Sequence, residues 1–121
     1  MTKLRRLPAI REQDVQAAIF TLLSYRGFRI FRRNTGAMTI DADPEHGKRG
    51  RYIKFSETGA ADLTGRHKTT GRTIEVECKR PGEKPSPEQY AWLDLAKVDG
   101  CIAFWADSVP MCDAKLREYG Y

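Results

Sequence analysis

The chain has 121 residues, of which 40% are hydrophobic and 31% are charged, and it carries a formal net charge of +5. A chain of this length can build one hydrophobic core but not two, so we expect a single domain over residues 1–121. No apolar run approaches the ~20 residues that cross a bilayer, and no long apolar segment follows the basic residues near the N-terminus. The sequence therefore predicts neither a membrane span nor a signal peptide, and we expect a cytoplasmic protein.

Three cysteines are present, Cys78, Cys101 and Cys112. Their number is odd, they are widely spaced, and each stands in an apolar context. This pattern favours reduced thiols in the core over disulfides or a zinc site.

The positive charge is unevenly distributed along the chain. Residues 1–73 hold 15 Lys and Arg against 7 Asp and Glu, whereas residues 74–121 hold 6 against 9. The basic part would suit a polyanion such as nucleic acid, although a solvated basic face is the simpler interpretation of charge alone. The residues available for phosphate contacts are Arg26, Arg29, Arg32, Arg33, Lys48, Arg49, Arg51, Lys54, Arg66 and Lys68.

The first predicted element is a helix over residues 10–24. Its apolar stripe is formed by Val15, Ala18, Ile19 and Leu22, at the spacing i, i+3, i+4 and i+7. Glu12 lies in the first turn, next to this stripe. From the pattern alone, the simpler role of Glu12 is a favourable contact with the helix dipole.

A strand is predicted over residues 28–33, with Phe28 and Ile30 on one face and Arg29 and Phe31 on the other. Residues 38–40 and 51–55 also have strand character. The segment 41–50 between them is rich in Asp, Pro and Gly, which is typical of an exposed loop.

Residues 73–79 alternate between apolar side chains at 74, 76 and 78 and polar side chains at 75, 77 and 79. This period of two predicts a strand with one apolar and one polar face. Glu77 and Lys79 therefore point to the same side of the sheet. Glu75 shares this face as a bystander.

The segment from Asp62 to residue 79 is predicted to form an antiparallel hairpin that turns at residues 68–71, where Gly71 accepts a positive φ easily. If the centre falls between Thr69 and Thr70, the numbers of facing residues add up to 139, and Asp62 faces Glu77. Directly opposed residues hold their Cβ atoms roughly 4.5 to 5.5 Å apart. Two carboxylates this close repel unless a proton or a cation lies between them. Oxygen ligands of this kind suit Mg²⁺ or Mn²⁺, but a slip of one residue would turn Asp62 to the other face.

The next predicted helix begins after Ser86, which is a good N-cap, with Pro87 at the first helical position and Gln89 at the third. This arrangement is a capping box, which alone accounts for Gln89. The helix extends to Asp99. The apolar run 101–106 predicts a buried strand parallel to 73–79, because strand, helix and strand form a right-handed crossover. A last helix is expected over residues 109–119, capped by Ser108.

Read together, these residues resemble the PD-(D/E)XK nuclease signature, and in particular its VRR-NUC branch in the minimal form found in phages and bacteria. The match covers residues 12–105 in chain order and rests on Glu12, Arg33-Asn34-Thr35-Gly36, Ala61-Asp62-Leu63-Thr64-Gly65, Glu77-Cys78-Lys79 and Gln89. One departure is Ala61, where the proline of the signature usually stands. The resemblance implies a restriction-endonuclease-like α/β fold, with a central mixed β-sheet flanked by helices.

The resemblance also implies roles for individual residues. Asp62 and Glu77 would bind Mg²⁺ or Mn²⁺, with the backbone carbonyl of Cys78 as a third ligand. Lys79 would orient or deprotonate the attacking water, and Glu12 and Gln89 would support the catalytic site. DNA contacts are expected from Arg29, Arg32, Arg33, Asn34, Lys48, Arg49, Arg51, Lys54 and Arg66.

The expected function is a metal-dependent DNA endonuclease that selects DNA structure, resembles Holliday-junction resolvases and acts as a homodimer on branched DNA, because a symmetric junction calls for two sites. Two alternatives remain open. The chain could be a nuclease subunit of a replication or restriction system that depends on a partner. It could also be a DNA-binding module with a decayed site.

Overall fold

The computed structural model describes residues 8–33, 37–40, 42–54 and 58–121. Its main sheet has four strands in the spatial order β1 (Phe28–Arg32), β4 (Leu63–His67), β5 (Thr73–Cys78) and β6 (Ile102–Ala106). The pairs β1–β4 and β4–β5 are antiparallel, whereas β5–β6 is parallel. The expected α/β architecture, a central mixed sheet flanked by helices, is therefore confirmed.

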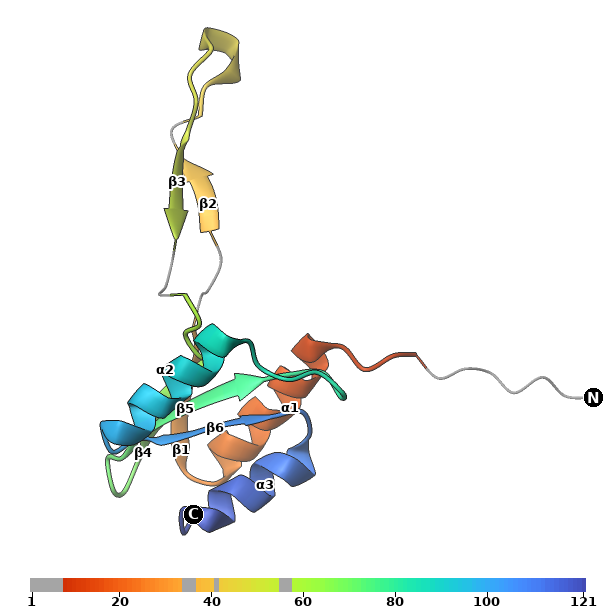
Figure 1. Cartoon of the computed structure of the whole chain (residues 1–121), viewed down its shortest axis with the longest axis vertical. Helices are drawn as coiled ribbons and strands as arrows, with labels where there is room; N and C mark the ends of the chain where they lie inside the picture. Colours follow the sequence, from red (N-terminus) through yellow and green to blue (C-terminus); the bar gives the residue numbers. More distant parts are fainter. Residues whose placement is uncertain (1–7, 34–36, 41, 55–57) are drawn as a thin grey trace, which may run out of the picture.

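Helices cover the two faces of this sheet unequally (Figure 1). One face packs against α1 (Glu12–Tyr25) and α3 (Val109–Glu118), and this layer holds the main core, which includes Ile19, Phe28 and Val76. The other face packs against α2 (Pro87–Val98), over a smaller cluster of Ala61, Leu93, Ala96 and Ala103. Within the described part of the chain, a single helix covers the second face.

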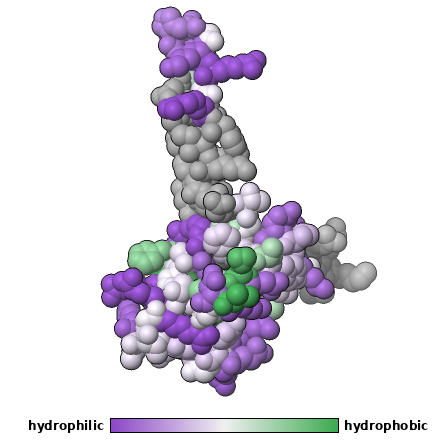
Figure 2. All heavy atoms as spheres, turned by 60° about the vertical axis from the view of Figure 1, so that its left-hand side comes forward, coloured by the Kyte–Doolittle hydropathy of each residue, from purple (hydrophilic) through white to green (hydrophobic). Residues whose placement is uncertain are grey.

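A second sheet consists of two strands, β2 (Ala37–Ile40) and β3 (Arg51–Lys54), which pair in antiparallel fashion with Ala37 opposite Lys54. A short 3₁₀ helix, Pro44–His46, lies between them. This β-arm stands away from the main body in Figure 1, and Figure 2 shows hydrophilic side chains over its far end. The two strands are confirmed, but they pair with each other and do not continue the main sheet. The segment between them is largely exposed.

The hairpin register is confirmed. Leu63 faces Val76 and Thr64 faces Glu75, so the numbers of facing residues add up to 139. Gly71 adopts a φ of +74° at the turn. Asp62 immediately precedes β4 and thus stands at the position that faces Glu77.

The bounds of the elements differ from the expected ones by one or two residues. The largest difference is at α1, which begins at Glu12 instead of residue 10, because Arg11 occupies the cap position and its backbone N–H donates to the Asp14 carboxylate at 3.1 Å. The buried stripe also differs: Leu23 is fully buried beside Val15 and Ile19, whereas Ala18 is exposed.

The polar side of β5 is buried, contrary to the expected half-exposed strand. Glu75 and Glu77 are 8% and 1% exposed. The reason is the central position of β5, between β4 and β6 and beneath α2. Two carboxylates inside the fold require partners, and these partners define the site described below.

Two further expectations can be compared with the structure. Cys78, Cys101 and Cys112 are free thiols, as expected, but only Cys78 and Cys112 are buried in the core, whereas Cys101 is half-buried. Among the described residues, no helix has the length and apolar character needed to cross a membrane.

Candidate metal centre and nucleic-acid interface

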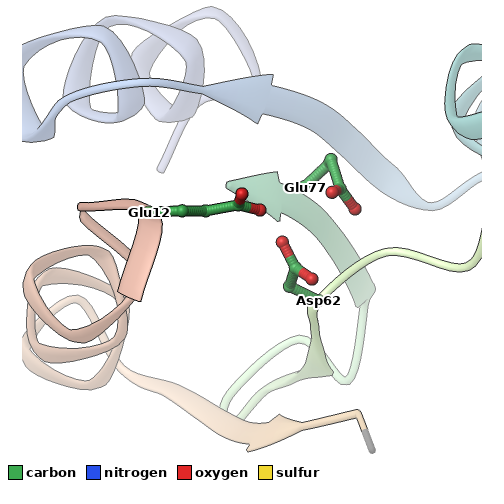
Figure 3. Close-up of side chains that lie close together, drawn as sticks. All are labelled: Glu12, Asp62 and Glu77. Carbon is green, nitrogen blue, oxygen red and sulfur yellow. The ribbon is translucent and has the colours of Figure 1, made fainter. Parts of the chain in front are cut away.

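Three carboxylates from separate parts of the chain point toward one another (Figure 3). Glu12 is the first residue of α1, Asp62 precedes β4, and Glu77 lies near the end of β5. One oxygen from each carboxylate lies within 4.8 Å of the other two. The structure therefore brings together the three acidic residues that the sequence placed at the site.

Backbone contacts hold Asp62 in this position. Its carbonyl oxygen accepts a hydrogen bond from the Arg33 N–H at 2.7 Å, which extends the pairing between β1 and β4 by one residue. Its Oδ2 accepts from the Cys78 N–H at 3.0 Å, which ties it to β5 next to Glu77. The Arg33 N–H thus fixes the backbone of Asp62, and the Cys78 N–H orients its carboxylate.

Glu77 has one satisfied and one unsatisfied oxygen. Its Oε1 accepts a hydrogen bond from Gln89 Nε2 at 2.9 Å and lies 3.7 Å from Lys79 Nζ. Its Oε2 is buried and has no hydrogen-bond partner among the described residues. A buried carboxylate oxygen without a partner is costly, so this atom is free to bind a cation.

The electrostatics of the cluster disfavour negative charge when no cation is bound. Burial raises the pKa of Glu77 to about 8, and the nearby charge of Asp62 adds to this rise, whereas Lys79 opposes it. Burial also raises the pKa of Glu12, again against the effect of Lys79. A divalent cation would reverse this balance, because it favours the ionised form of every carboxylate around it.

The donor set fits Mg²⁺ or Mn²⁺. Carboxylate oxygens are the ligands that these ions prefer, and one or two carboxylates with waters complete a typical site. The unsatisfied Oε2 of Glu77 supplies a ligand atom that no side chain of the described residues already occupies. The carbonyl of Cys78 as a further ligand remains a prediction.

Gln89 joins the helix cap to the cluster. Its Oε1 accepts from the Ser86 N–H at 2.9 Å and its own N–H donates to Ser86 Oγ at 3.2 Å, which confirms the predicted capping box. Its Nε2 is left free to donate to Glu77. One side chain therefore serves both the cap and the carboxylate.

We expect the metal-free protein to lose stability as the pH rises from 5 to 8. Glu77 has a pKa near 4.5 when unfolded and about 8 when folded. The stability that Glu77 contributes in its neutral form is therefore fully present below pH 4.5 and is lost as the pH passes through 8. Over this interval the free energy of unfolding falls by up to about 1.4 kcal/mol per pH unit. Urea unfolding in EDTA at several pH values measures this slope. A free energy of unfolding that rises over the same interval would contradict the assignment.

The basic residues expected to contact DNA lie in two regions. Arg29 and Arg32 of β1 and Arg66 of β4 are exposed on the main sheet. On the β-arm, Lys48, Arg49 and Arg51 are exposed. Asn34 and the side chain of Lys54 lie outside the described part of the structure. The described residues thus place positive charge on both the body and the arm.

Arg33 has a different environment from the one that the sequence suggested. Its guanidinium donates two hydrogen bonds to Glu75, at 3.0 and 3.1 Å, and one to the carbonyl of Ala61 at 2.8 Å. It also lies over the ring of Trp92, 5.0 Å from the centroid. Arg33 therefore neutralises the buried Glu75, which is not a bystander, and it holds the segment before Asp62.

We expect Arg33→Ala to destabilise the protein by about 2 kcal/mol, because it leaves the buried carboxylate of Glu75 without its partner. Arg32→Ala is the matched control, since Arg32 is the exposed last residue of β1 and directly precedes Arg33. Urea unfolding of both variants measures the difference. Equal unfolding midpoints would show that the pair with Glu75 contributes nothing.

No protein-family model matches the chain, and a search of curated proteins finds no match either.

Proposed function

We propose that this chain is a metal-dependent DNA endonuclease of the VRR-NUC type, with a PD-(D/E)XK fold. The observation that carries the proposal is the convergence of Glu12, Asp62 and Glu77, with one buried oxygen of Glu77 left without a partner. The confirmed hairpin register supports it, because this register brings Asp62 opposite Glu77.

Hydrolysis of a phosphodiester requires a barrier reduction on the order of 20 kcal/mol. A bound Mg²⁺ or Mn²⁺ would supply activation of water and neutralisation of the developing charge. In the proposal, Asp62 and Glu77 hold this ion and Glu12 completes the negative environment. Gln89 keeps Glu77 in place through the hydrogen bond to Oε1.

Lys79 is the proposed catalytic cation. Its side chain is 13% exposed and its Nζ lies 3.7 Å from Glu77 Oε1, so the ammonium is held at the edge of the cluster. At this place it can donate to the attacking water or to the scissile phosphate.

The proposed substrate is branched DNA, and the proposed active form is a homodimer, as for a Holliday-junction resolvase. The exposed basic side chains of the sheet and of the β-arm supply contacts to more than one region of the DNA backbone. These contacts carry no sequence information by themselves, which favours selection by structure.

The test is cleavage of a labelled four-way junction, a flap and a linear duplex in Mg²⁺, in Mn²⁺ and in EDTA. Asp62→Asn is compared with Asp94→Asn, which alters an exposed carboxylate of α2. We expect metal-dependent nicking of branched DNA by the wild type and by Asp94→Asn, but not by Asp62→Asn.

The other outcomes separate the alternatives. Cleavage of linear duplex at an equal rate would retain the nuclease and refute the selection of branched DNA. Absence of cleavage on every substrate, together with tight DNA binding, would refute the autonomous nuclease in favour of a partner-dependent subunit or a binding module.

A further inference from the structure

Half of one sheet face is open. On the face that carries the carboxylates, α2 contacts β5 and β6. The side chains of β1 and β4 on this face are more accessible: Arg29 and Arg66 are exposed, Phe31 is 57% exposed, and Thr64 is half-buried. This open half of the sheet, formed by Arg29, Phe31, Thr64 and Arg66, is uncovered in the described structure.

The open half of the sheet continues directly into the candidate metal centre. Side chains two residues apart on a strand share a face, so Thr64 and Arg66 point to the same side as Asp62. Phe31 pairs with Thr64, which in turn pairs with Glu75, two residues before Glu77. A chain lying on this surface would therefore run beside the three carboxylates.

Two positive side chains face each other on this surface. Arg29 of β1 is directly opposite Arg66 of β4. Directly opposed like charges on neighbouring strands are destabilising. Within the part of the chain that the structure describes, neither guanidinium forms an ion pair or a hydrogen bond. This pair is thus available to an anion, and two neighbouring guanidinium groups suit phosphate oxygens.

Phe31 adds a feature that a simple anion would not require. It lies two residues after Arg29 on the same strand face, and the residue is 57% exposed. Phe31 also lines a groove of about 520 Å³ between β1 and α1, together with residues that include Ala17 and Phe20. An exposed aromatic ring beside guanidinium groups is the combination on which proteins stack unpaired bases while binding their phosphates.

From this juxtaposition we infer that the open half of the sheet binds an unpaired stretch of DNA. Phe31 stacks on a base, and Arg29 and Arg66 bind the adjoining phosphates. Paired bases do not offer a free face to such a ring, because they are stacked in the duplex. The inference rests on the proposed function in placing this stretch beside the metal centre, and it narrows the substrate to branched DNA with unpaired nucleotides at the branch.

Binding in EDTA tests this inference independently of cleavage. Fluorescence anisotropy is measured with a labelled oligothymidine and with a duplex of the same length. We expect Phe31→Ala to weaken oligothymidine binding roughly 5- to 150-fold, the range for loss of one stacked base, with little change for the duplex. Phe31→Trp should retain the affinity. Tyr25→Ala, which removes an aromatic ring that is 87% exposed on α1, should not alter it.

The arginine pair is tested by the dependence of oligothymidine affinity on salt. Arg29→Gln and Arg66→Gln should each reduce the slope of log K against log salt by about 0.7, the value for one phosphate contact on a single strand. Arg117→Gln on α3 is the matched control, because α3 lies on the opposite face of the sheet.

Two results would overturn the inference. One is unchanged oligothymidine affinity in Phe31→Ala, and the other is an equal loss for the duplex, which would indicate a general phosphate surface. These results are distinct from a failure of the nuclease proposal. If the protein does not cleave but binds oligothymidine through Phe31, the nuclease proposal is refuted and the binding of unpaired DNA is supported. If the protein cleaves and Phe31→Ala leaves oligothymidine binding unchanged, the nuclease proposal is supported and the binding of unpaired DNA is refuted.

Discussion

Replacement of Glu77 by Gln is expected to reduce metal-dependent cleavage at least ~10³-fold, because a neutral amide cannot replace a carboxylate as a ligand of the ion that stabilises the transition state. The same variant should be more stable than the wild type at pH 8 in EDTA. Its amide removes a charge that burial and Asp62 disfavour, while its carbonyl can still accept the hydrogen bond from Gln89. Opposite effects on activity and stability distinguish a ligand from a structural residue.

Glu118→Gln, at the exposed end of α3, is the matched control and should change neither the rate of cleavage nor the free energy of unfolding. The measurements are initial rates on the preferred branched substrate and urea unfolding at pH 5.5 and 8. A Glu77→Gln variant that cleaves at the rate of the wild type would exclude Glu77 as a metal ligand. A variant whose stability in EDTA keeps the pH dependence of the wild type would exclude Glu77 as the titrating group.

Gly65→Ala should destabilise the fold by about 3 kcal/mol, because the site has no room for a side chain. A Cβ atom at Gly65 would lie 1.9 Å from the carbonyl oxygen of Arg29, and this oxygen belongs to the backbone of the neighbouring strand. The two strands would have to separate. Because Asp62 precedes β4, the candidate metal centre would be displaced with them.

Gly71→Ala provides the comparison. Gly71 has a φ of +74°, but a Cβ atom there would meet no atom within 4 Å. Its cost is therefore only the strain of the left-handed conformation, about 1 kcal/mol. Urea unfolding of the two variants measures the difference. Equal midpoints would show that β1 and β4 adjust to the added methyl group without loss.

The central hairpin could be predicted because local signals and chemistry agreed. A turn centred between Thr69 and Thr70 gives facing residues whose numbers add up to 139, and this register also brings the two carboxylates of Asp62 and Glu77 together. The capping box at Ser86 and Gln89 was equally local, and it is present. The parallel pairing of β5 with β6 followed from the handedness of the crossover.

Other features depend on contacts between residues far apart in the chain, which periodicity does not reveal. Arg33 resembles any other arginine of the basic half, yet it pairs with Glu75, 42 residues later. The burial of Glu75 and Glu77 arises only when α2 lies over β5. The alternation of side chains along β1 correctly assigned Phe31 to the face opposite Phe28. That α2 covers β5 and β6 on this face but leaves β1 exposed could not be anticipated from the sequence of one strand.

The link between Gln89 and Glu77 has a consequence for the dynamics of the protein. The first turn of a helix is where fraying begins, and each opening of the cap at Ser86 would release the amide that restrains Glu77. In the proposed metal centre, opening of α2 and release of the ion would therefore be coupled equilibria. By linkage, this coupling is reciprocal. A ligand that holds Glu77 slows hydrogen exchange at the start of α2 by a certain factor, and a more stable helix start strengthens the binding of that ligand by the same factor.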